Sequence, residues 1–223
     1  MATDLRRLGK LSRGPGVWSG MDRLTLALRT ESDEELVAGV RAGSHSFSVL
    51  VSRHAGAVYR TLRGAVGDEA EARALTTETF RMAERALPDF DGSRSFSIWL
   101  LRLALHRAMA SGLWQHGASF ADWHVPPPLN APILDAELAL DALPDAYRLA
   151  FVLGEVEGLA PEDAAAIQRI APETHRARAF RARWALAAVL SREAVDALFY
   201  AYRMYLSEAD SLRRELSGTA AAA

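Results

Sequence analysis

Hydrophobic residues recur every three to four positions along most of this chain, which is the pattern of amphipathic α-helices. Over residues 31–111 the pattern is interrupted at Gly43, Gly67 and Pro88, and it contains no alternation of the strand type. These interruptions divide the region into four helices, the last of them over residues 96–110. The sequence therefore predicts an all-α protein that begins with a four-helix bundle.

The first of these helices has its own start signal. Ser32 precedes the helix and Glu35 follows three residues later. This is the spacing of a capping box, in which each side chain bonds the backbone N–H of the other residue. The helix is therefore expected to begin directly after Ser32.

A second helical unit is predicted over residues 136–190. Within it a short amphipathic helix ends at Gly158, and Pro161 opens the next helix, where a proline loses no needed hydrogen bond. That helix breaks near Arg169, and Pro172 starts another. Short helices joined by a tight break are typical of a helix-turn-helix, whose second helix meets a nucleic-acid backbone.

The last helix of this unit carries many arginines. Residues 169–183 hold five arginines against the single Glu173, a local balance of +4. Their spacing spreads them over a broad stripe of the helix. Guanidinium groups pair with phosphates and read guanine edges in a major groove, so the stripe is a candidate DNA contact. A solvated helix face is the alternative, because the whole chain favours arginine and Lys10 is its only lysine.

The overall charge limits how the chain meets DNA. Its 223 residues include 26 basic and 28 acidic side chains, which leaves a formal charge of -2. A protein whose whole surface wraps DNA is usually more basic. Any DNA contact is therefore expected to be local, or shared with a partner. The chain has no cysteine, which excludes disulfides and thiolate zinc sites and fits the cytoplasmic location that we expect.

The sequence gives no sign of catalysis. No glycine-rich phosphate loop or Ser/His/Asp arrangement occurs at a recognisable spacing. His116 and His124 lack carboxylate or thiolate partners at ligand spacing, so we expect no metal and no other cofactor. The chain is therefore expected not to be an enzyme. Four acidic residues are explained as turn and helix-surface positions rather than acid/base pairs, namely Asp89, Asp91, Glu155 and Glu157.

Three further segments complete the predicted organisation. Residues 1–30 are predicted to be a flexible tail, with a true start near Met21 as a hypothesis. Residues 112–135 contain three consecutive prolines and predict a linker between the two units. Residues 191–217 predict a C-terminal amphipathic helix that packs back on the helix-turn-helix or docks a partner. No apolar run reaches about 20 residues, so no membrane insertion is expected.

The order of these parts resembles the extracytoplasmic-function (ECF) sigma factors, the smallest bacterial promoter-recognition subunits of RNA polymerase. SDEELVAGVRAGSHSFSVLVSRHAGAVYR at 32–60 is similar to the start of the family's second region, and LTTETFRMAERAL at 75–87 to its polymerase-binding helix. FSIWLLRLALHRAM at 96–109 is similar to the promoter-melting helix. LPDAYRLAFVLGEVEGLAPEDAAAI, which begins at Leu143, is similar to the fourth region.

The resemblance implies a sigma region-2-like bundle over 31–111 and a region-4-like helix-turn-helix over 136–190, with core RNA polymerase and promoter DNA as partners. It implies polymerase contacts at Leu75, Thr77, Glu78, Thr79 and Arg81. It implies contacts to the minus-ten element, where a flipped base is held, at Arg94, Ser95, Trp99, Arg102 and His106. It implies contacts to the minus-thirty-five element at Thr174, Arg176, Arg178, Arg181 and Arg183.

The resemblance also implies a candidate inhibitor and leaves an alternative function open. An anti-sigma factor is a candidate partner, and residues 191–217 are one surface where it could dock. The chain would then be a sigma factor that starts transcription at its own promoters. The alternative is a sigma-like regulatory protein that binds an anti-sigma factor or another partner without promoter activity.

Several positions depart from the family pattern. Arg169 stands at a turn glycine, where a left-handed backbone costs a residue with a side chain about 1 kcal/mol or more. His175 stands where a buried aliphatic is usual, and burial there would make the helix sensitive to pH. These changes fit either a divergent sigma factor or a sigma-like protein that has lost one DNA contact. The other departures are Ala74, Thr77 and Glu84 in the polymerase-binding helix, and Ala110, Ser111 and Gly112 after the melting helix.

Overall fold

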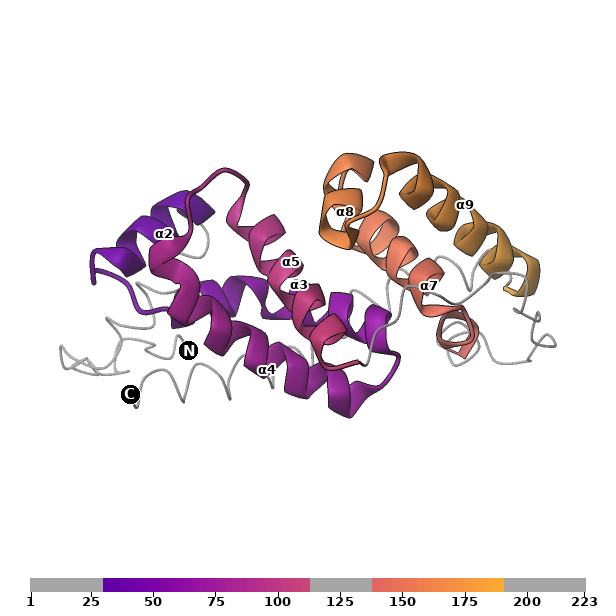
Figure 1. Cartoon of the computed structure of the whole chain (residues 1–223), viewed down its shortest axis with the longest axis horizontal. Coiled ribbons are helices and arrows are strands. Elements are labelled where there is room, and N and C mark those ends of the chain that lie inside the picture. Colours follow the sequence, from indigo (N-terminus) through magenta and orange to yellow (C-terminus); the bar gives the residue numbers. More distant parts are fainter. Residues whose placement is uncertain (1–29, 113–137, 191–223) are drawn as a thin grey trace, which may run out of the picture.

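The computed structural model describes residues 30–112 and 138–190, and these residues form helices and their connections, without a strand (Figure 1). The expected all-α class is confirmed. The first unit consists of α2 (Asp33–Arg41), α3 (Ser48–Val66), α4 (Glu69–Ala86), the 3-10 turn η1 (Leu87–Asp89) and α5 (Phe96–Ala110). The second consists of α7 (Asp145–Phe151), the π-helical segment η3 (Val152–Val156), α8 (Pro161–Gln168) and α9 (Pro172–Val189).

Three predictions concern residues outside this description. They are the N-terminal tail apart from its last residue Thr30, with its start near Met21, the linker apart from its first residue, and the C-terminal helix over residues 191–217. The two histidines weighed as metal ligands, His116 and His124, also lie outside the described residues.

The first helix begins where its sequence signal places it. Ser32 Oγ accepts a hydrogen bond from the N–H of Glu35 (3.2 Å), and Glu35 Oε2 accepts one from the N–H of Ser32 (2.7 Å). The predicted capping box is therefore confirmed. Asp33 then fixes α2 to α3, because its carboxylate contacts Arg53 and His54 at 3.0 Å each. Burial alone would raise the pKa of Asp33, but hydrogen bonds and charge from His54 and Arg53 outweigh it and hold that pKa below its ordinary value.

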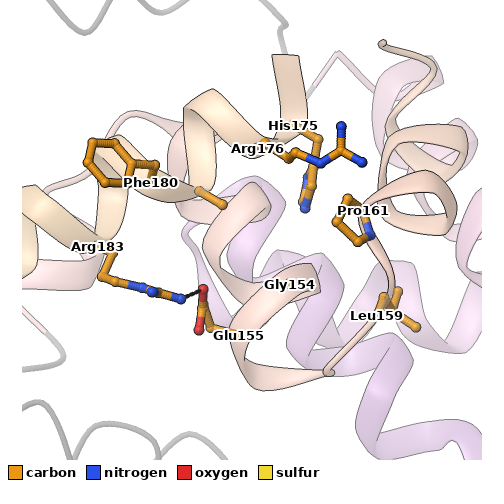
Figure 2. Close-up of a pocket in the computed structure, with 9 residues that line it drawn as sticks. Gly154, Glu155, Leu159, Pro161, His175, Arg176, Phe180 and Arg183 are labelled. Atoms are coloured by element: carbon orange, nitrogen blue, oxygen red, sulfur yellow. Dashed lines mark hydrogen bonds and ion pairs between the residues drawn. The ribbon is translucent and has the colours of Figure 1, made fainter. Parts of the chain in front are cut away.

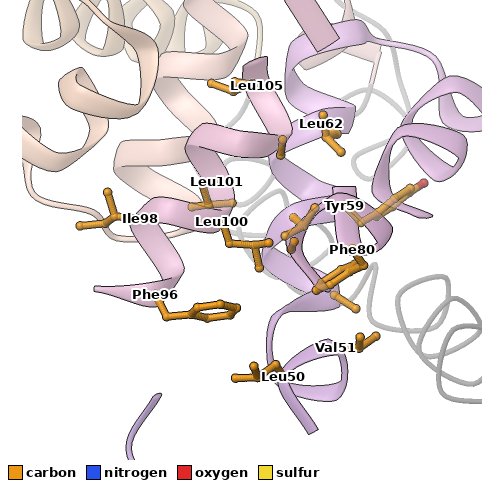
Figure 3. Packing of buried hydrophobic residues seen from close by; sticks show 14 of the residues in the cluster. Leu50, Val51, Tyr59, Leu62, Phe80, Phe96, Ile98, Leu100, Leu101 and Leu105 are labelled. Atoms are coloured by element: carbon orange, nitrogen blue, oxygen red, sulfur yellow. The ribbon is translucent and has the colours of Figure 1, made fainter. Parts of the chain in front are cut away.

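Helix α3 is the centre of the bundle, packed against both α4 and α5. Its Tyr59 and Leu62 are buried among side chains such as Phe80 of α4 and Leu100 of α5 (Figure 3). Gly67 ends the helix with a left-handed φ of 74°, a conformation that glycine adopts without a steric penalty. The core therefore orients α4 and α5, the two helices expected to bind polymerase and promoter.

The supporting helix of the second unit differs from the expected single α-helix. Its first part is α7, and from Val152 to Val156 the backbone widens into the π-helical η3. The N–H of Glu157 bonds the carbonyl of Val152 (2.9 Å), five residues earlier, as a π-turn requires. The apolar spacing alone could not reveal the extra residue in this turn.

The two units pack against each other. Helix α3 lies beside α7 and η3, and α5 lies beside α8. Four apolar side chains of the second unit belong to the same buried cluster as the core of the bundle, namely Leu149, Leu153, Ala164 and Ile167. The sequence pattern predicted two units joined by a linker and gave no indication of this direct contact.

Candidate nucleic-acid interface

Helix α9 shows a clear division between its two sides. Ala182, Ala185 and Leu186 are buried against the second unit's own core. The expected contacts Thr174, Arg176, Arg181 and Arg183 are exposed, whereas Arg178 is half-buried with one terminal nitrogen, Nη1, that has no hydrogen-bond partner. Four of the five side chains assigned to the minus-thirty-five element are thus accessible to DNA.

Two exposed arginines of α9 are paired with glutamates of neighbouring elements. Arg176 pairs with Glu162 of α8, and at 3.6 Å with Glu173 of its own helix. Arg183 pairs with Glu155 of η3 (Figure 2). Within the described residues, neither Arg178 nor Arg181 has an ion pair. Of the four arginines on α9, two are therefore paired with a carboxylate and two are not, within the described residues.

Two large aromatic side chains lie on the same helix and were not singled out from the sequence. Phe180 is 68% exposed and Trp184 is 62% exposed, one helical turn apart. Arg176 and Arg183 flank them on that side. The spacing of 176, 180, 183 and 184 could have shown that aromatic and cationic groups share this face.

The turn before α9 has the backbone that its sequence was expected to need. Arg169 adopts φ 56° and ψ 44°, and it is the only non-glycine among the described residues with a positive φ. The N–H of Ile170 bonds the carbonyl of Ala165 at 3.1 Å and so closes the end of α8. The prediction of a strained, side-chain-bearing residue at this turn is confirmed.

His175 is buried, only 2% exposed, and it is held by a neighbour. The Gln168 side-chain amide donates to His175 Nδ1 (2.7 Å) and to the carbonyl of Ala164 (3.0 Å). The ring hydrogen therefore sits on Nε2, which points toward Gly154 (Figure 2). Burial lowers the pKa of His175 below its ordinary value, and the charges of Arg176 and Arg178 act in the same direction.

A pocket of about 230 Å³ opens beside this histidine, between η3, the start of α8 and α9 (Figure 2). Leu159, Pro161 and Ala179 supply apolar lining, while Arg176 and Arg183 stand among its charged residues. Arg176 pairs with Glu162 and Arg183 pairs with Glu155, so a carboxylate already neutralises each of these two positive charges.

The expected minus-ten residues lie on the loop before α5 and on that helix. Arg94, Arg102 and His106 are exposed, and Ser95 and Trp99 are half-buried. Trp99 packs on Phe90 and Phe96 with ring centroids 5.2 and 5.4 Å away. Positions 99, 102 and 106 are three and four residues apart, so they share one side of α5. The structure thus places the ring of Trp99, the guanidinium of Arg102 and the imidazole of His106 on one side of α5.

The loop itself is ordered by local hydrogen bonds. Asp91 accepts a hydrogen bond from the N–H of Ser93 (2.9 Å), which lowers the pKa of Asp91 below its ordinary value. Arg41 of α2 donates through Nε to the carbonyl of Leu87 at 3.1 Å. Asp91 and Arg41 therefore stabilise the conformation of the connection between α4 and α5.

The expected polymerase contacts on α4 divide into two groups. Leu75 and Thr79 are buried, and Thr79 Oγ1 donates to the carbonyl of Leu75 at 2.7 Å. Thr77 and Glu78 are half-buried and Arg81 is exposed. Glu78 also accepts a hydrogen bond from Arg107 of α5 (2.6 Å). Three of the five side chains therefore reach the surface, and two support it from the core.

The sequence analysis missed the arginine that joins the two units. Arg148 of α7 is 3% exposed, and its Nε donates to the carbonyl of Gly64 in α3 at 2.8 Å. A signal was present, because Arg148 stands four residues before Val152 and eight before Val156 on the apolar side of the supporting helix. A charged residue on that side calls for buried partners.

Two features of other functional classes are missing from the part of the chain that the structure describes. No cluster of three His, Cys, Asp or Glu side chains is placed to hold a metal ion in residues 30–112 or 138–190. None of the helices in these two ranges is long and apolar enough to cross a membrane.

Comparison with known proteins identifies the family. The model for sigma-70 region 2 matches residues 50–110. The RNA polymerase sigma-H factor of Pseudomonas aeruginosa is 30% identical over 181 residues, which cover 71% of this chain and 94% of that protein. The ECF RNA polymerase sigma-E factor of Escherichia coli K12 is 30% identical over 182 residues, which cover 70% and 92%.

A solved structure of CnrH in complex with the cytosolic domain of CnrY is similar to 70% of this chain and to 95% of the matched chain, at 26% identity and a TM-score of 0.49. The two sigma factors named first are matched over nearly their whole length. This chain belongs to the ECF family of RNA polymerase sigma factors.

Proposed function

We propose that this chain binds core RNA polymerase in the cytoplasm and directs it to promoters through separate contacts with the minus-ten and minus-thirty-five elements. The observation that carries the proposal is the division of α9, whose arginine side is exposed while its alanine side is buried. A helix of this kind at the end of a helix-turn-helix fits the major groove. Binding energy, rather than chemistry in this subunit, would open the promoter.

The minus-thirty-five element is assigned to α9. Thr174, Arg176 and Arg181 are exposed and can donate hydrogen bonds to base edges, while Arg183 can reach a phosphate. A good bidentate contact between an arginine and a guanine contributes about 1 to 3 kcal/mol of discrimination. DNA phosphates would have to replace Glu162 and Glu155 as the partners of Arg176 and Arg183.

The minus-ten element is assigned to α5 and the loop before it. Trp99 presents a half-buried ring beside the exposed Arg102 and His106. Aromatic side chains stack on unpaired bases, and each such contact contributes about 1 to 3 kcal/mol. Arg94 and Ser95 would add contacts to the DNA backbone at the edge of the melted region.

The polymerase contact is assigned to the surface of α4. Thr77, Glu78 and Arg81 reach solvent there, and the buried Leu75 and Thr79 hold the helix against the core. The pair between Glu78 and Arg107 links this surface to α5. A partner bound to this surface of α4 would therefore lie next to a side chain that contacts the helix expected to open the promoter.

Run-off transcription with purified core polymerase and genomic DNA tests the proposal. We expect initiation only when this chain is present. Arg176→Ala and Arg181→Ala should each weaken binding to the upstream element by about 1 to 3 kcal/mol if the side chain contacts a base. Glu34→Ala is the control, because this exposed residue lies on α2, outside the surfaces assigned to DNA and polymerase.

The alternative, a sigma-like regulatory protein, gives a different result in the same experiment. A folded chain that neither co-purifies with core polymerase nor supports initiation would support the alternative and exclude the proposed role. Binding to core with unchanged initiation in both α9 variants would leave the polymerase contact in place and remove α9 as a promoter reader.

A further inference from the structure

A buried hydrogen-bond donor faces the pocket beside α9. The side-chain nitrogen of Gln168 donates to the carbonyl of Ala164 (3.0 Å), so it is the NH2 end of that amide. The same nitrogen contacts His175 Nδ1 at 2.7 Å, which makes Nδ1 an acceptor and places the ring hydrogen on Nε2. Within residues 30–112 and 138–190, no group accepts a hydrogen bond from this Nε2. A donor on a side chain that is only 2% exposed is expected to have an acceptor.

The pocket leaves room for an acceptor next to Nε2. It holds about 230 Å³ between η3, the start of α8 and α9, and His175 forms part of its wall (Figure 2). Gly154 of η3 also lines it, and a Cβ at Gly154 would lie 3.3 Å from Nε2. Because Gly154 has no side chain, the space next to the N–H stays open. Drug-sized ligands occupy about 300 to 1,000 Å³, so this pocket fits a smaller molecule of one ring.

The wall of the pocket has an apolar part and a cationic part. Three side chains make up most of the apolar part, namely Leu159, Pro161 and Ala179. The cationic part consists of the guanidinium groups of Arg176 and Arg183. Ligand sites commonly combine an apolar lining with a few polar groups that orient the ligand. An apolar surface beside an N–H donor and a cation fits a ring that carries a carboxylate.

Arg176 is the cation that a bound carboxylate can recruit. It pairs with Glu162, and these two side chains are 50% and 62% exposed. Exposed ion pairs contribute little free energy, so their partners are readily exchanged. Glu162 stands in the first turn of α8, where the helix dipole stabilises a carboxylate that has lost its arginine. Arg183 pairs with the less exposed Glu155, and this pair leaves the charge of that side of the pocket balanced.

We propose that this pocket binds a small organic acid, one apolar ring with a single carboxylate, and that the bound acid competes with the minus-thirty-five element. One carboxylate oxygen accepts the hydrogen of His175 Nε2, the other pairs with Arg176, and the ring lies against the apolar wall. Arg176 cannot hold the acid and DNA at once. The binding itself stands on the pocket, whereas its effect on promoter recognition rests on the proposed function.

Titration of the full-length chain with sodium benzoate, followed by NMR of the histidine ring N–H groups, tests the site. The Nε2–H resonance of His175 should move downfield as it gains an acceptor, with a Kd of roughly 1 mM or lower for a ligand of this size. The chain has six histidines, and His175→Leu identifies the resonance by removing it. A resonance that does not respond to benzoate would overturn the proposal.

Two related probes test the chemistry of the ligand. Sodium acetate carries the carboxylate without the ring and should bind at least tenfold more weakly than benzoate. Benzamide carries the ring and an acceptor without the charge, so it cannot recruit Arg176 and should also bind at least threefold more weakly. Acetate binding as tightly as benzoate would show an adventitious anion contact only. Benzamide binding as tightly as benzoate would overturn the assignment of a carboxylate.

A matched pair of substitutions on α9 tests the location. Ala179→Leu places a larger side chain in the wall of the pocket and should weaken benzoate binding at least tenfold. Ala188→Leu is the control, because Ala188 is exposed and does not line the pocket, and it should leave the Kd unchanged. His175→Leu removes the donor but keeps a buried apolar side chain, and it should also weaken binding at least tenfold. Unchanged affinity in either pocket variant, folded by circular dichroism, would overturn the site.

Promoter binding separates this inference from the proposed function. At a benzoate concentration ten times its Kd, the polymerase complex should bind upstream promoter DNA roughly tenfold more weakly, because a competitor reduces affinity by the factor 1 + [L]/Kd. Sodium acetate at the same concentration controls for ionic strength. Ala179→Leu should lose the sensitivity to benzoate. Unchanged promoter binding by a chain saturated with benzoate would overturn the competition. A wild-type chain that supports no transcription without benzoate would exclude the proposed function, whereas the titration decides the ligand site by itself.

Discussion

Two regions of this protein are built on arginine and use it in opposite ways. Where α3 meets the second unit, Arg148 is buried and the side chain of Arg60 is 15% exposed, and both have fixed partners on the other unit. On α9, Arg176 and Arg183 are exposed, and each pairs with a glutamate that is itself partly or largely exposed. Buried pairs hold one geometry, whereas exposed pairs exchange partners at little cost.

The difference shows that burial, rather than residue type, decides what an arginine does here. A stripe of arginines on α9 is easily recognised in the sequence, and it marks the surface that we propose exchanges glutamates for phosphates. The single arginines on α3 and α7 give no such pattern, yet they join the two units. Each of the following experiments changes one side of this comparison.

The largest effect on stability is expected for a substitution of Arg148. Arg148→Met keeps much of the volume but leaves the carbonyls of Gly64, Asp141 and Leu143 without their donor. Removing one member of a buried charged network typically costs about 3 to 5 kcal/mol. We expect the free energy of unfolding, measured with urea on the full chain, to fall by at least about 3 kcal/mol. Arg85→Ala, at an exposed site, should change it by less than about 0.5 kcal/mol.

If Arg148→Met lowers the free energy of unfolding by less than about 1 kcal/mol, Arg148 contributes no more to stability than the exposed arginines of α9 are expected to. It would mean that water or another donor replaces the guanidinium at the end of α3. The comparison between a structural and an exchangeable arginine would then fail.

The next largest effect on stability is expected at His175, on the buried side of α9. Because its folded pKa is lowered, the unfolded chain binds the proton more readily, and stability is lost as the pH falls below about 6.5. The slope contributed by this one proton is at most about 1.4 kcal/mol per pH unit. Urea unfolding between pH 7.5 and 5 should show this loss, and His175→Val should reduce it.

Identical pH profiles for the wild type and His175→Val would show that another group causes the dependence. His175→Gln is a second control, because it keeps a polar side chain against Gln168 but cannot take up a proton. Its profile should follow that of the valine variant.

Much of this architecture could be predicted from the sequence. The capping box at Ser32, the end of α3 at Gly67 and the extent of α5 depend on residues adjacent in the chain, so local rules identify them. The left-handed turn at Arg169 could be placed for the same reason. The π-helical η3 and the docking of the two units depend on contacts between residues far apart, such as Gly64 with Val152, which no local pattern contains.

The candidate site divides in the same way. The exposed arginines of α9 follow from helical spacing, so their exposure could be predicted. The burial of Leu75 and Thr79 also follows from spacing, because they stand four residues apart on the core side of α4. The glutamate partners of Arg176 and Arg183 lie on η3 and α8, and only the tertiary fold brings them together.

A smaller effect is expected at the turn before α9. Arg169→Gly removes the penalty of a side chain at φ 56° and should raise the free energy of unfolding by about 1 kcal/mol. Gly158→Ala is the matched opposite, because that glycine has φ 66° and a Cβ added there would meet no atom within 4 Å. It should lower stability by about the same amount. Thermal unfolding of the two variants should shift in opposite directions, and shifts in the same direction would contradict the strain argument.

The smallest effect on stability is expected where the exposed arginines meet their glutamates. Glu162→Gln and Glu155→Gln should each change the free energy of unfolding by less than about 0.5 kcal/mol, because surface pairs contribute little. Each should nevertheless strengthen binding of the polymerase complex to upstream promoter DNA about two- to threefold, a change of under about 0.7 kcal/mol. Each guanidinium then no longer has to leave a carboxylate before it meets a phosphate. The gain should shrink as salt is raised, since phosphate contacts weaken with ionic strength.

Glu34→Gln, an exposed change on α2, should leave DNA binding unchanged. Weaker DNA binding in both variants would mean that the glutamates position the arginines for DNA rather than compete with it. The arginines of α9 would then resemble Arg148 and Arg60, which hold one fixed geometry where α3 meets the second unit.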